Sequence, residues 1–556
     1  MMRKWMIMFI MGIGLVSFIG CNICTSSFNA NFEEEQREAE TTPFGRYPEE
    51  VVYTLGKMTG TNNSNMPKGD TYEDNAYTRY LKEKLNIQNK DVFEEDTDYD
   101  NMVSMAITAE DLPDVMVVSD TEQLQMLVEK DLIEDLTEVY ENCASDTIKD
   151  IYASYGEEIF ENVTINGKLM AVPETNIENG PSLVWLRKDW MDKLHLAAPK
   201  TLDDVEEIIK QFIEKDPGNN GKGNTIGLLC DANIIGEAGY SYEYQTDIIF
   251  SSYGSFPKQF VYSKDGELVY GSIQPEAKEA LKRLNRMYKD GILDSQFLLR
   301  STGNIIDLIT SGKSGSFFGP WWAPNNPLID AKKVNGDADW EPYLIQTDAD
   351  GSTCYASQNP SYKYVVVRKG YEHPEIVMKI ISVLFDYARF QDTDAKEMAM
   401  YYKLNVDPTA RPLAINVDYS NALMRCYKNL TNALIGKEKS SNLEQIEQSY
   451  YDACKDYVNK KENATCEEWA AYTSRIKACG VIENGKTKQV KSLFFGETET
   501  MKEKWLSLGK LEEQTYLRII TGEAPIKEFD AFVAKWKQSG GDTILREVKE
   551  SIENTK

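Results

Sequence analysis

The sequence predicts an α/β protein, in which strands alternate with helices around substantial apolar cores. Two observations support this fold class. The 556-residue chain is 42% hydrophobic and 27% charged, close to the average of globular domains, and long enough for one large domain or two to three ordinary ones. Short apolar runs typical of buried strands also alternate along the chain with segments whose apolar residues recur at helical spacing.

Each expected element depends on hydrophobic spacing or on a turn signal. The run 114–118 follows Pro113 and is apolar after its first residue, as a buried strand is. Asn166-Gly167 is a hairpin-type turn that precedes another apolar run. In chain order we expect strands at 51–55, 114–118, 168–173 and 182–187, and helices at 72–85, from 124, 188–194, 205–212, 275–288, 374–387, 443–457 and around 529–536.

The charge composition argues against two classes of function. The formal net charge is -28, and no stretch of clustered Lys and Arg interrupts it, so nucleic acid is not an expected partner. Only two histidines occur, which disfavours histidine-based catalysis and multi-histidine metal sites. The 89 Asp and Glu residues leave carboxylate chemistry open, so a glycan-cleaving enzyme is not excluded by composition.

The N-terminus predicts export and lipid attachment. Arg3 and Lys4 precede an apolar run, 5–19, that is short for a membrane span of about 20 residues. Gly20-Cys21 ends this run in the manner of a bacterial lipobox, so we expect a signal peptide at 1–20 and a lipid on Cys21. Residues 21–48 are rich in Glu and lack an apolar period, which predicts an acidic, solvated tether.

The nine cysteines include one CxxC spacing, Cys21 and Cys24, at the expected end of the signal peptide, and no second such pair, which excludes a zinc ribbon on spacing alone. Cys426, Cys454, Cys466 and Cys479 lie close together late in the chain. An extracellular location permits disulfides among them, and buried free thiols are an equally good interpretation.

Several segments together resemble the solute-binding lipoproteins of carbohydrate ABC importers, in particular the large Gram-positive branch of family 1, which is similar to maltose-binding protein. Each segment is weak alone, but their order covers about residues 50–550. They are Leu112-Pro113-Asp114-Val115-Met116, Asn166-Gly167-Lys168-Leu169 with Val172-Pro173, residues 184–194 and 199–204, Gly315-Ser316-Phe317-Phe318-Gly319-Pro320-Trp321-Trp322, Glu528-Phe529-Asp530, and Gly540-Gly541-Asp542.

The resemblance implies a periplasmic-binding-protein type II fold: two α/β lobes, a hinge and a ligand cleft between them. Lobe 1 is expected from 49–180 with about 355–400, and lobe 2 from 181–354 with about 401–556. The chain then crosses between lobes near 174–182, 350–360 and 400. Lobe closure on the ligand would signal to the importer, as a population shift of a hinge-bending protein.

Aromatic and carboxylate side chains at the expected cleft edges are the candidate ligand-binding residues. Sugars present flat C–H faces, which suit aromatic platforms. Trp321 and Trp322 follow an apolar strand and resemble a Gly-Pro-Trp segment of the family's cleft wall, and Trp185 is a further candidate. Glu174 and Asp114 each lie near the end of a strand and are candidate acceptors for hydroxyl groups.

Residues 216–227 lie where the family often has a calcium loop that is similar to an EF-hand. Asp216, Asn220 and Asn224 supply oxygens at suitable positions, with the carbonyl of Lys222. Gly218 lacks a side-chain oxygen, and Thr225 stands where an acid is expected. We therefore favour a turn that has lost the metal and expect no cofactor.

The sequence as a whole predicts a monomeric extracellular lipoprotein without catalytic activity, which delivers an oligosaccharide to the permease subunits of an ABC importer and contacts the membrane through its lipid. The alternatives are a surface-anchored glycan-degrading enzyme and a peptide-binding or adhesive lipoprotein. The sugar itself is not determined by the sequence.

Overall fold

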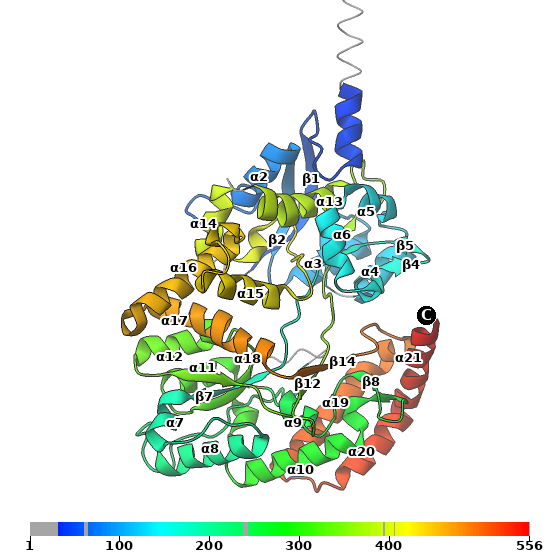
Figure 1. The fold of residues 1–556 in the computed structure, drawn as a ribbon. Helices are drawn as coiled ribbons and strands as arrows, with labels where there is room; N and C mark the ends of the chain where they lie inside the picture. Colours follow the sequence, from blue (N-terminus) through cyan, green and yellow to red (C-terminus); the bar gives the residue numbers. More distant parts are fainter. Residues whose placement is uncertain are drawn as a thin grey trace, which may run out of the picture.

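The computed structural model describes residues 32–60, 65–119, 121–236, 243–392, 395–404 and 406–554, and forms two lobes joined by crossing segments (Figure 1). Lobe 1 lies at the top of this view and lobe 2 at the bottom. The expected signal peptide and Cys21 lie outside the described residues. Within the described ranges, no helix combines the length and the apolar character needed to cross a membrane.

Lobe 1 is built on a five-stranded mixed sheet with the strand order β2-β1-β3-β13-β6. Alternate residues of β3 enter two different apolar clusters, Val115 and Val117 one of them and Met116 and Val118 the other, so both faces of the strand are covered. The elements are β1 Val51–Met58, α2 Ala76–Leu85, β2 Ile87–Glu95, α3 Tyr99–Ala109, β3 Val115–Val118, α4 Thr121–Glu129, α5 Thr137–Cys143, α6 Asp146–Ala153, the hairpin β4 Thr164–Ile165 and β5 Lys168–Leu169, β6 Val172–Pro173, β13 Tyr364–Val367, α13 Ile376–Ser382 and α14 Lys396–Leu404.

Lobe 2 has a smaller sheet, in which β7 pairs antiparallel with β10 on one side and β11 on the other. Its fully buried strand β7 again divides its side chains between two cores. The elements are β7 Leu183–Arg187, α7 Lys188–Leu194, α8 Leu202–Lys215, α9 Asp247–Ser251, the hairpin β8 Phe260–Tyr262 and β9 Leu268–Tyr270, α10 Pro275–Lys289, α11 Thr302–Thr310, β10 Ser316–Gly319, α12 Ile329–Val334, β11 Trp340–Tyr343, β12 Thr353–Ala356 with its parallel partner β14 Thr487–Val490, α19 Glu499–Thr521, α20 Glu528–Trp536 and α21 Asp542–Asn554.

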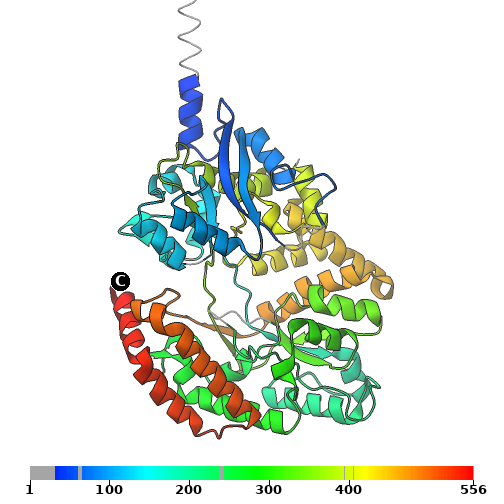
Figure 2. The same ribbon diagram turned by 180° about the vertical axis from the view of Figure 1, so that it is seen from behind.

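A group of helices between the two lobes contacts both of them on one side of the molecule (Figures 1 and 2). It consists of α15 Ala422–Leu434, α16 Gln445–Lys460, α17 Cys466–Tyr472 and α18 Cys479–Asn484. Helix α16 packs on α14 of lobe 1, whereas α17 packs on α12 of lobe 2. The four late cysteines belong to this group and are free thiols, all buried except the partly exposed Cys466.

Residues 32–48, the described part of the expected tether, are more ordered than a solvated tether. Residues 32–41 form a helix, and Tyr47 is fully buried in lobe 1. Lys379 Nζ also donates to the carbonyl oxygen of Thr42 at 2.8 Å. The acidic residues Glu33–Glu35 remain exposed, as a solvated segment requires. The chain therefore docks on lobe 1 before β1, because an aromatic side chain and a backbone carbonyl find partners there.

The third crossing lies later in the chain than the expected position near residue 400. Residues 395–417 pack into the core of lobe 1 through Met398, Tyr401, Leu413 and Ile415, all of them buried. The boundary expected at residue 400 is therefore wrong by nearly twenty residues, because this apolar segment belongs to lobe 1. The chain leaves that lobe only at about residue 418.

Candidate functional site

The three crossing segments run side by side and are joined through their backbones. Residues 174–178 lie between residues 359–363 and 416–420 and donate to both neighbours over N···O distances of 2.7–2.9 Å. A hinge made of a few extended segments can absorb the rotation of one lobe against the other. The bonds run from Glu174 N to Lys363 O, Asn176 N to Pro360 O, Thr175 N to Asn416 O, and Glu178 N to Ser420 O.

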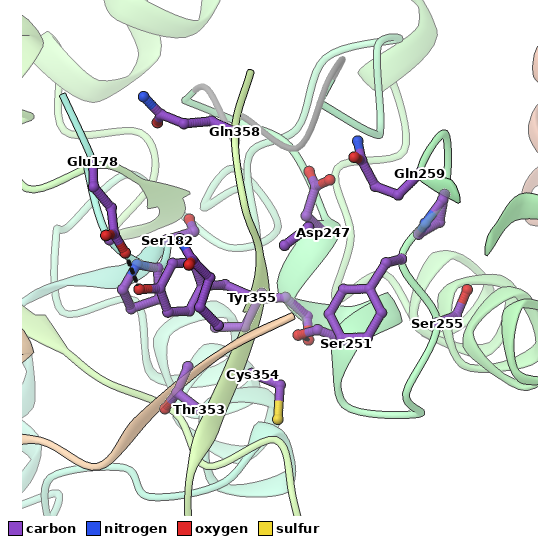
Figure 3. Close-up of a pocket in the computed structure, with 17 residues that line it drawn as sticks. Glu178, Ser182, Asp247, Ser251, Ser255, Gln259, Thr353, Cys354, Tyr355 and Gln358 are labelled. Atoms are coloured by element: carbon purple, nitrogen blue, oxygen red, sulfur yellow. Dashed lines mark hydrogen bonds between the residues drawn. The ribbon is translucent and has the colours of Figure 1, made fainter. Parts of the chain in front are cut away.

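A pocket opens beside this hinge on lobe 2 (Figure 3). Its empty space, including the open mouth, is about 650 Å³. The first and second crossings, the start of α9 and the loop before β8 all contribute to the lining. Its polar side chains include Glu178, Ser182, Asp247, Gln259, Tyr355 and Gln358.

Hydrogen bonds hold the side chains of the two crossings in place. The hydroxyl of Tyr355 donates to the carboxylate of Glu178. The pKa of Tyr355 is raised mainly by its burial and further by this hydrogen bond. Gln358 Nε2 donates to the carbonyl of Ile177 at 2.6 Å, and Asn179 Nδ2 donates to Gln358 Oε1 at 3.4 Å. The acceptor and donor groups of this wall are thus fixed before any ligand arrives.

Two buried polar groups of the pocket lack a hydrogen-bond partner within the described part of the chain. These are Gln259 Nε2 and Ser182 Oγ. The two residues are only 2% and 8% exposed. A buried group without a partner costs about 1–3 kcal/mol, so such atoms mark the place where a bound molecule or an ordered water completes the bonding.

A second hollow continues from the pocket toward lobe 1. Gln259 lines both hollows, which are therefore adjacent. The second is lined by Thr121 of lobe 1 and Asn359 of the second crossing, and by Asn233 and Trp505 of lobe 2. The combined site is thus lined by lobe 2 and the hinge, and Thr121 is its described lining residue from lobe 1.

The three predicted tryptophans have different environments. Trp185 is fully buried and its Nε1 donates to Pro320 O at 3.1 Å, so its expected place at the cleft is wrong: it belongs to the sheet core. Trp321 is 6% exposed, and the guanidinium of Arg475 lies 4.5 Å from its ring centroid. Trp322 is partly buried at the edge of the same apolar cluster. Of the three, Trp322 keeps the most accessible side chain.

Trp321 contacts the hinge through its polar edge. Its Nε1 donates to Asn179 Oδ1 in the first crossing at 3.0 Å. Because Arg475 covers one ring face and the remainder is nearly buried, Trp321 supports the hinge instead of offering a free stacking surface.

The two predicted carboxylates lie at opposite ends of the lobe 1 sheet. Glu174 begins the first crossing and is buried, and this burial raises its pKa although Lys363 opposes the effect. Asp114 precedes β3, whereas the crossings lie at the other end of the sheet, where β6 pairs with the start of β13. It accepts hydrogen bonds from Thr54 and pairs with Arg368 at 2.7 Å. Its expected role at the cleft is therefore wrong.

The predicted calcium loop is closed by its own hydrogen bonds. Asp216 accepts from the backbone amides of Asn220 and Gly221, both at 2.8 Å, and from the hydroxyl of Thr225 at 2.7 Å. Asn224 Nδ2 donates to Asn220 O at 3.0 Å. Lys222, whose backbone carbonyl was the further expected oxygen, is exposed.

A side chain at position 218 would collide with the Trp190 ring, since a Cβ there lies 2.5 Å from a ring carbon. The missing oxygen ligand can therefore not be restored at this position. With a single carboxylate, the residues present do not fit a calcium site of six to eight oxygens.

Two partly buried carboxyl groups at the edge of the lobe 2 sheet have raised pKa values. Burial raises the pKa of Asp231 to about 6 and that of Glu243 to about 7. Tyr244, next to Glu243, donates through its backbone to Phe318 O at 2.8 Å, which places this stretch beside β10. Both carboxyl groups therefore take up a proton at a higher pH than an exposed carboxyl group does.

Sequence reasoning missed Glu178, Gln259, Tyr355 and Gln358, which form much of the site. Glu178 and Gln358 belong to segments that the sequence places near lobe crossings, so the position of these crossings could have identified them as candidate site residues. Gln259 follows a loop without any motif, and only the folded structure brings it to the same pocket as Ser182.

Comparison with known families identifies a sequence profile that covers more than half of the chain. The profile, described as bacterial extracellular solute-binding protein, matches residues 63–387. Among curated proteins, the polygalacturonan/rhamnogalacturonan-binding protein YtcQ of Bacillus subtilis is 23% identical over 72% of this chain and 73% of its own. The fructooligosaccharide-binding FusA of Streptococcus pneumoniae is 25% identical over 27% of each chain.

Solved structures share the fold over almost the entire chain. FusA in complex with kestose superposes with a TM-score of 0.60 at 15% identity, covering 91% of this chain and 99% of its own. The alginate-binding protein AlgQ2 superposes with a TM-score of 0.57 at 13% identity, covering 91% and 98%. These similarities confirm the expected α/β fold of the binding-protein type.

Proposed function

Because the chain belongs to the family of bacterial extracellular solute-binding proteins, we propose that it binds an oligosaccharide between its lobes and delivers it to an ABC importer. The family captures solutes and is not catalytic, as the sequence predicts. The observation that carries the proposal is the pocket beside the hinge, with fixed carboxylates and amides on its wall and two buried polar groups without partners.

The chemistry of this site suits a ligand that carries many hydroxyl groups. Each hydroxyl both donates and accepts, so it can satisfy a carboxylate and an amide at once. The polygalacturonan/rhamnogalacturonan-binding relative YtcQ and the fructooligosaccharide-binding relative FusA support a carbohydrate ligand here. Trp322 is the best-placed predicted aromatic side chain for contact with a sugar ring.

Lobe closure supplies the signal to the importer. The ligand must bind the closed form more tightly than the open form, because only differential affinity shifts the population. Residues of both lobes line the second hollow, so a ligand that fills it contacts both and favours closure.

Membrane attachment occurs through a lipid on Cys21. The described N-terminal helix, residues 32–41, projects from lobe 1 away from lobe 2 (Figure 1), so the anchor reaches the protein through lobe 1. A fatty-acid probe fed to cells that produce the wild type should label it, and the Cys21→Ala variant should remain unlabelled. Equal labelling of both proteins would exclude this attachment.

A binding screen tests the proposal as a whole. The mature protein, probed against oligosaccharides and against peptides of similar size, should bind one or more oligosaccharides with one-to-one stoichiometry in calorimetry and return them uncut after long incubation. Binding of peptides alone would support the adhesive or peptide-binding alternative, and cleavage of the glycan would reveal an enzyme.

A further inference from the structure

Aromatic side chains line the second hollow, which continues from the pocket toward lobe 1. They are those of Phe260, Tyr270, Phe494 and Trp505. With the open mouths included, the empty space of this hollow is about 1710 Å³, against about 650 Å³ for the pocket beside the hinge. A ligand that begins in the pocket therefore has room to continue past these aromatic side chains.

Trp505 belongs to α19 and packs on the apolar core of lobe 2, yet its side chain is only partly buried. The Phe260 ring stacks against it with a centroid distance of 6.0 Å, and the Tyr270 ring meets it edge-on at 5.5 Å. These neighbours hold the indole ring in one orientation before a ligand arrives. An indole ring that is fixed in this way suits the flat, apolar C–H face of a sugar.

A glycine lies one helical turn after this tryptophan. Gly509 follows Trp505 at i+4, so the two positions are neighbours on the surface of α19, and both line the hollow. Outside the backbone of its own helix, no described atom lies within 4 Å of a Cβ built at Gly509, and its φ is not positive. Neither packing nor backbone conformation requires glycine here, although glycine inside a helix is less favourable than alanine.

A bound molecule gives this glycine a function. Without a side chain at position 509, a chain that stacks on Trp505 can pass close to the backbone of α19. The amide side chains of Asn233 and Asn359 and the ammonium group of Lys510 also line the hollow. Aromatic surface beside hydrogen-bonding groups is the combination that suits a molecule with apolar ring faces and many hydroxyl groups.

We propose that the second hollow binds the further sugar units of a long oligosaccharide, with Trp505 as the stacking platform and Gly509 as the gap over which the sugar chain runs. The protein would then select long oligosaccharides over short ones. This inference rests on the proposed function, which leaves the length of the oligosaccharide open. One end of the ligand occupies the pocket beside the hinge, and Gln259, which lines both hollows, marks the passage between them.

Calorimetry with oligosaccharides of increasing length tests the inference with the full mature protein. The probes are maltooligosaccharides, fructooligosaccharides and oligogalacturonates, each from the disaccharide upward. In a series that binds, the affinity should rise by about tenfold or more from the shortest to the longest bound member, because the added units make contacts in the second hollow. An affinity that does not depend on chain length would overturn the inference.

Variants assign the length dependence to the two named residues. Trp505→Ala should weaken the longest ligand by about tenfold or more and change the affinity for the shortest by less than about twofold. Gly509→Leu should obstruct the path and likewise weaken only the long ligand. Ser507→Leu is the matched control, since it adds the same side chain at an exposed position of α19 that does not line the hollow, and it should leave both affinities unchanged.

The Gly509→Ala variant tests whether the fold itself needs the glycine. Its melting temperature should rise, because the methyl group meets no described atom and alanine favours the helix. A lower melting temperature would show that the fold requires glycine at this position and would overturn the role given to it.

Failure of the subsite differs from failure of the proposed function. If Trp505→Ala and Gly509→Leu bind long ligands as the wild type does, or weaken long and short ligands equally, the subsite is refuted while carbohydrate binding stands. A protein that binds none of these series and no oligosaccharide of the binding screen would refute the proposed function itself, and the subsite with it.

Discussion

Replacement of Trp321 by alanine should destabilise the fold more than it weakens ligand binding. The side chain is 6% exposed, donates to Asn179 and stacks against Arg475. A buried tryptophan removes about 200 Å² from water, which at about 25 cal/mol/Å² gives an upper estimate of about 5 kcal/mol. The hydrogen bond adds about 1 kcal/mol and the cation–π contact about 0.5–2 kcal/mol. Part of this is recovered by relaxation, so we expect a loss of about 3–5 kcal/mol.

Guanidinium unfolding followed by circular dichroism measures this loss, and calorimetry with the best oligosaccharide measures binding by the folded fraction. Trp322→Ala is the matched control: its partly buried side chain should lose less stability and more affinity. A Trp321→Ala protein as stable as the wild type, but with affinity reduced by tenfold or more, would refute the assignment of Trp321 to the core and restore it as a sugar platform.

Three further outcomes follow from the contacts described above. Asp114→Asn should lose about 1–3 kcal/mol of stability with unchanged binding, because Thr54 donates to this carboxylate. Burial alone would raise the pKa of Asp114, but hydrogen bonds from Thr54 and Arg368 hold it below its usual value. The ionised carboxylate therefore contributes fully to the free energy of unfolding above the unfolded pKa of about 3.9, and this contribution is lost as the pH falls through the lower folded pKa. The difference in the free energy of unfolding between wild type and variant, measured by urea unfolding, should therefore shrink at acidic pH. Excess calcium should not raise the melting temperature of the wild type, and Asp216→Ala should lower the melting temperature equally with and without calcium. A calcium-dependent rise that disappears in this variant would show a functional metal site. Tyr355→Phe should weaken ligand binding by about 1 kcal/mol in calorimetry, because Glu178 loses the donor that orients it; an affinity equal to that of the wild type would show that this contact does not shape the site.

The alternation of apolar runs was sufficient to predict the α/β class and the strands β1, β3 and β7, but not most of the other strands. The strand expected at 114–118 is β3, which begins one residue later, and the segment expected as 182–187 is β7 at Leu183–Arg187. These strands are buried on both faces and appear as continuous apolar runs. The lobe boundary near residue 400 was not predictable in this way, because residues 395–417 carry no pattern that distinguishes one core from the other.

The site was less predictable than the fold, because it is assembled from segments that are far apart in the sequence. Gln259 and Ser182 are ordinary polar residues in loops, and their unpartnered atoms become visible only when burial is known. Tryptophan is a weak signal for a different reason. Trp185 lies within a strand and Trp321 follows one, and both side chains are buried in the core. Asp114 shows the same limit, since a residue beside a strand can lie at either end of the sheet.

An oligosaccharide that binds between the two lobes should draw them together. Small-angle X-ray scattering of the mature protein, titrated with the best ligand from the binding screen, tests this closure directly. We predict a radius of gyration that decreases and saturates at one equivalent of ligand. An unchanged radius of gyration at full saturation would contradict closure of the lobes around the ligand.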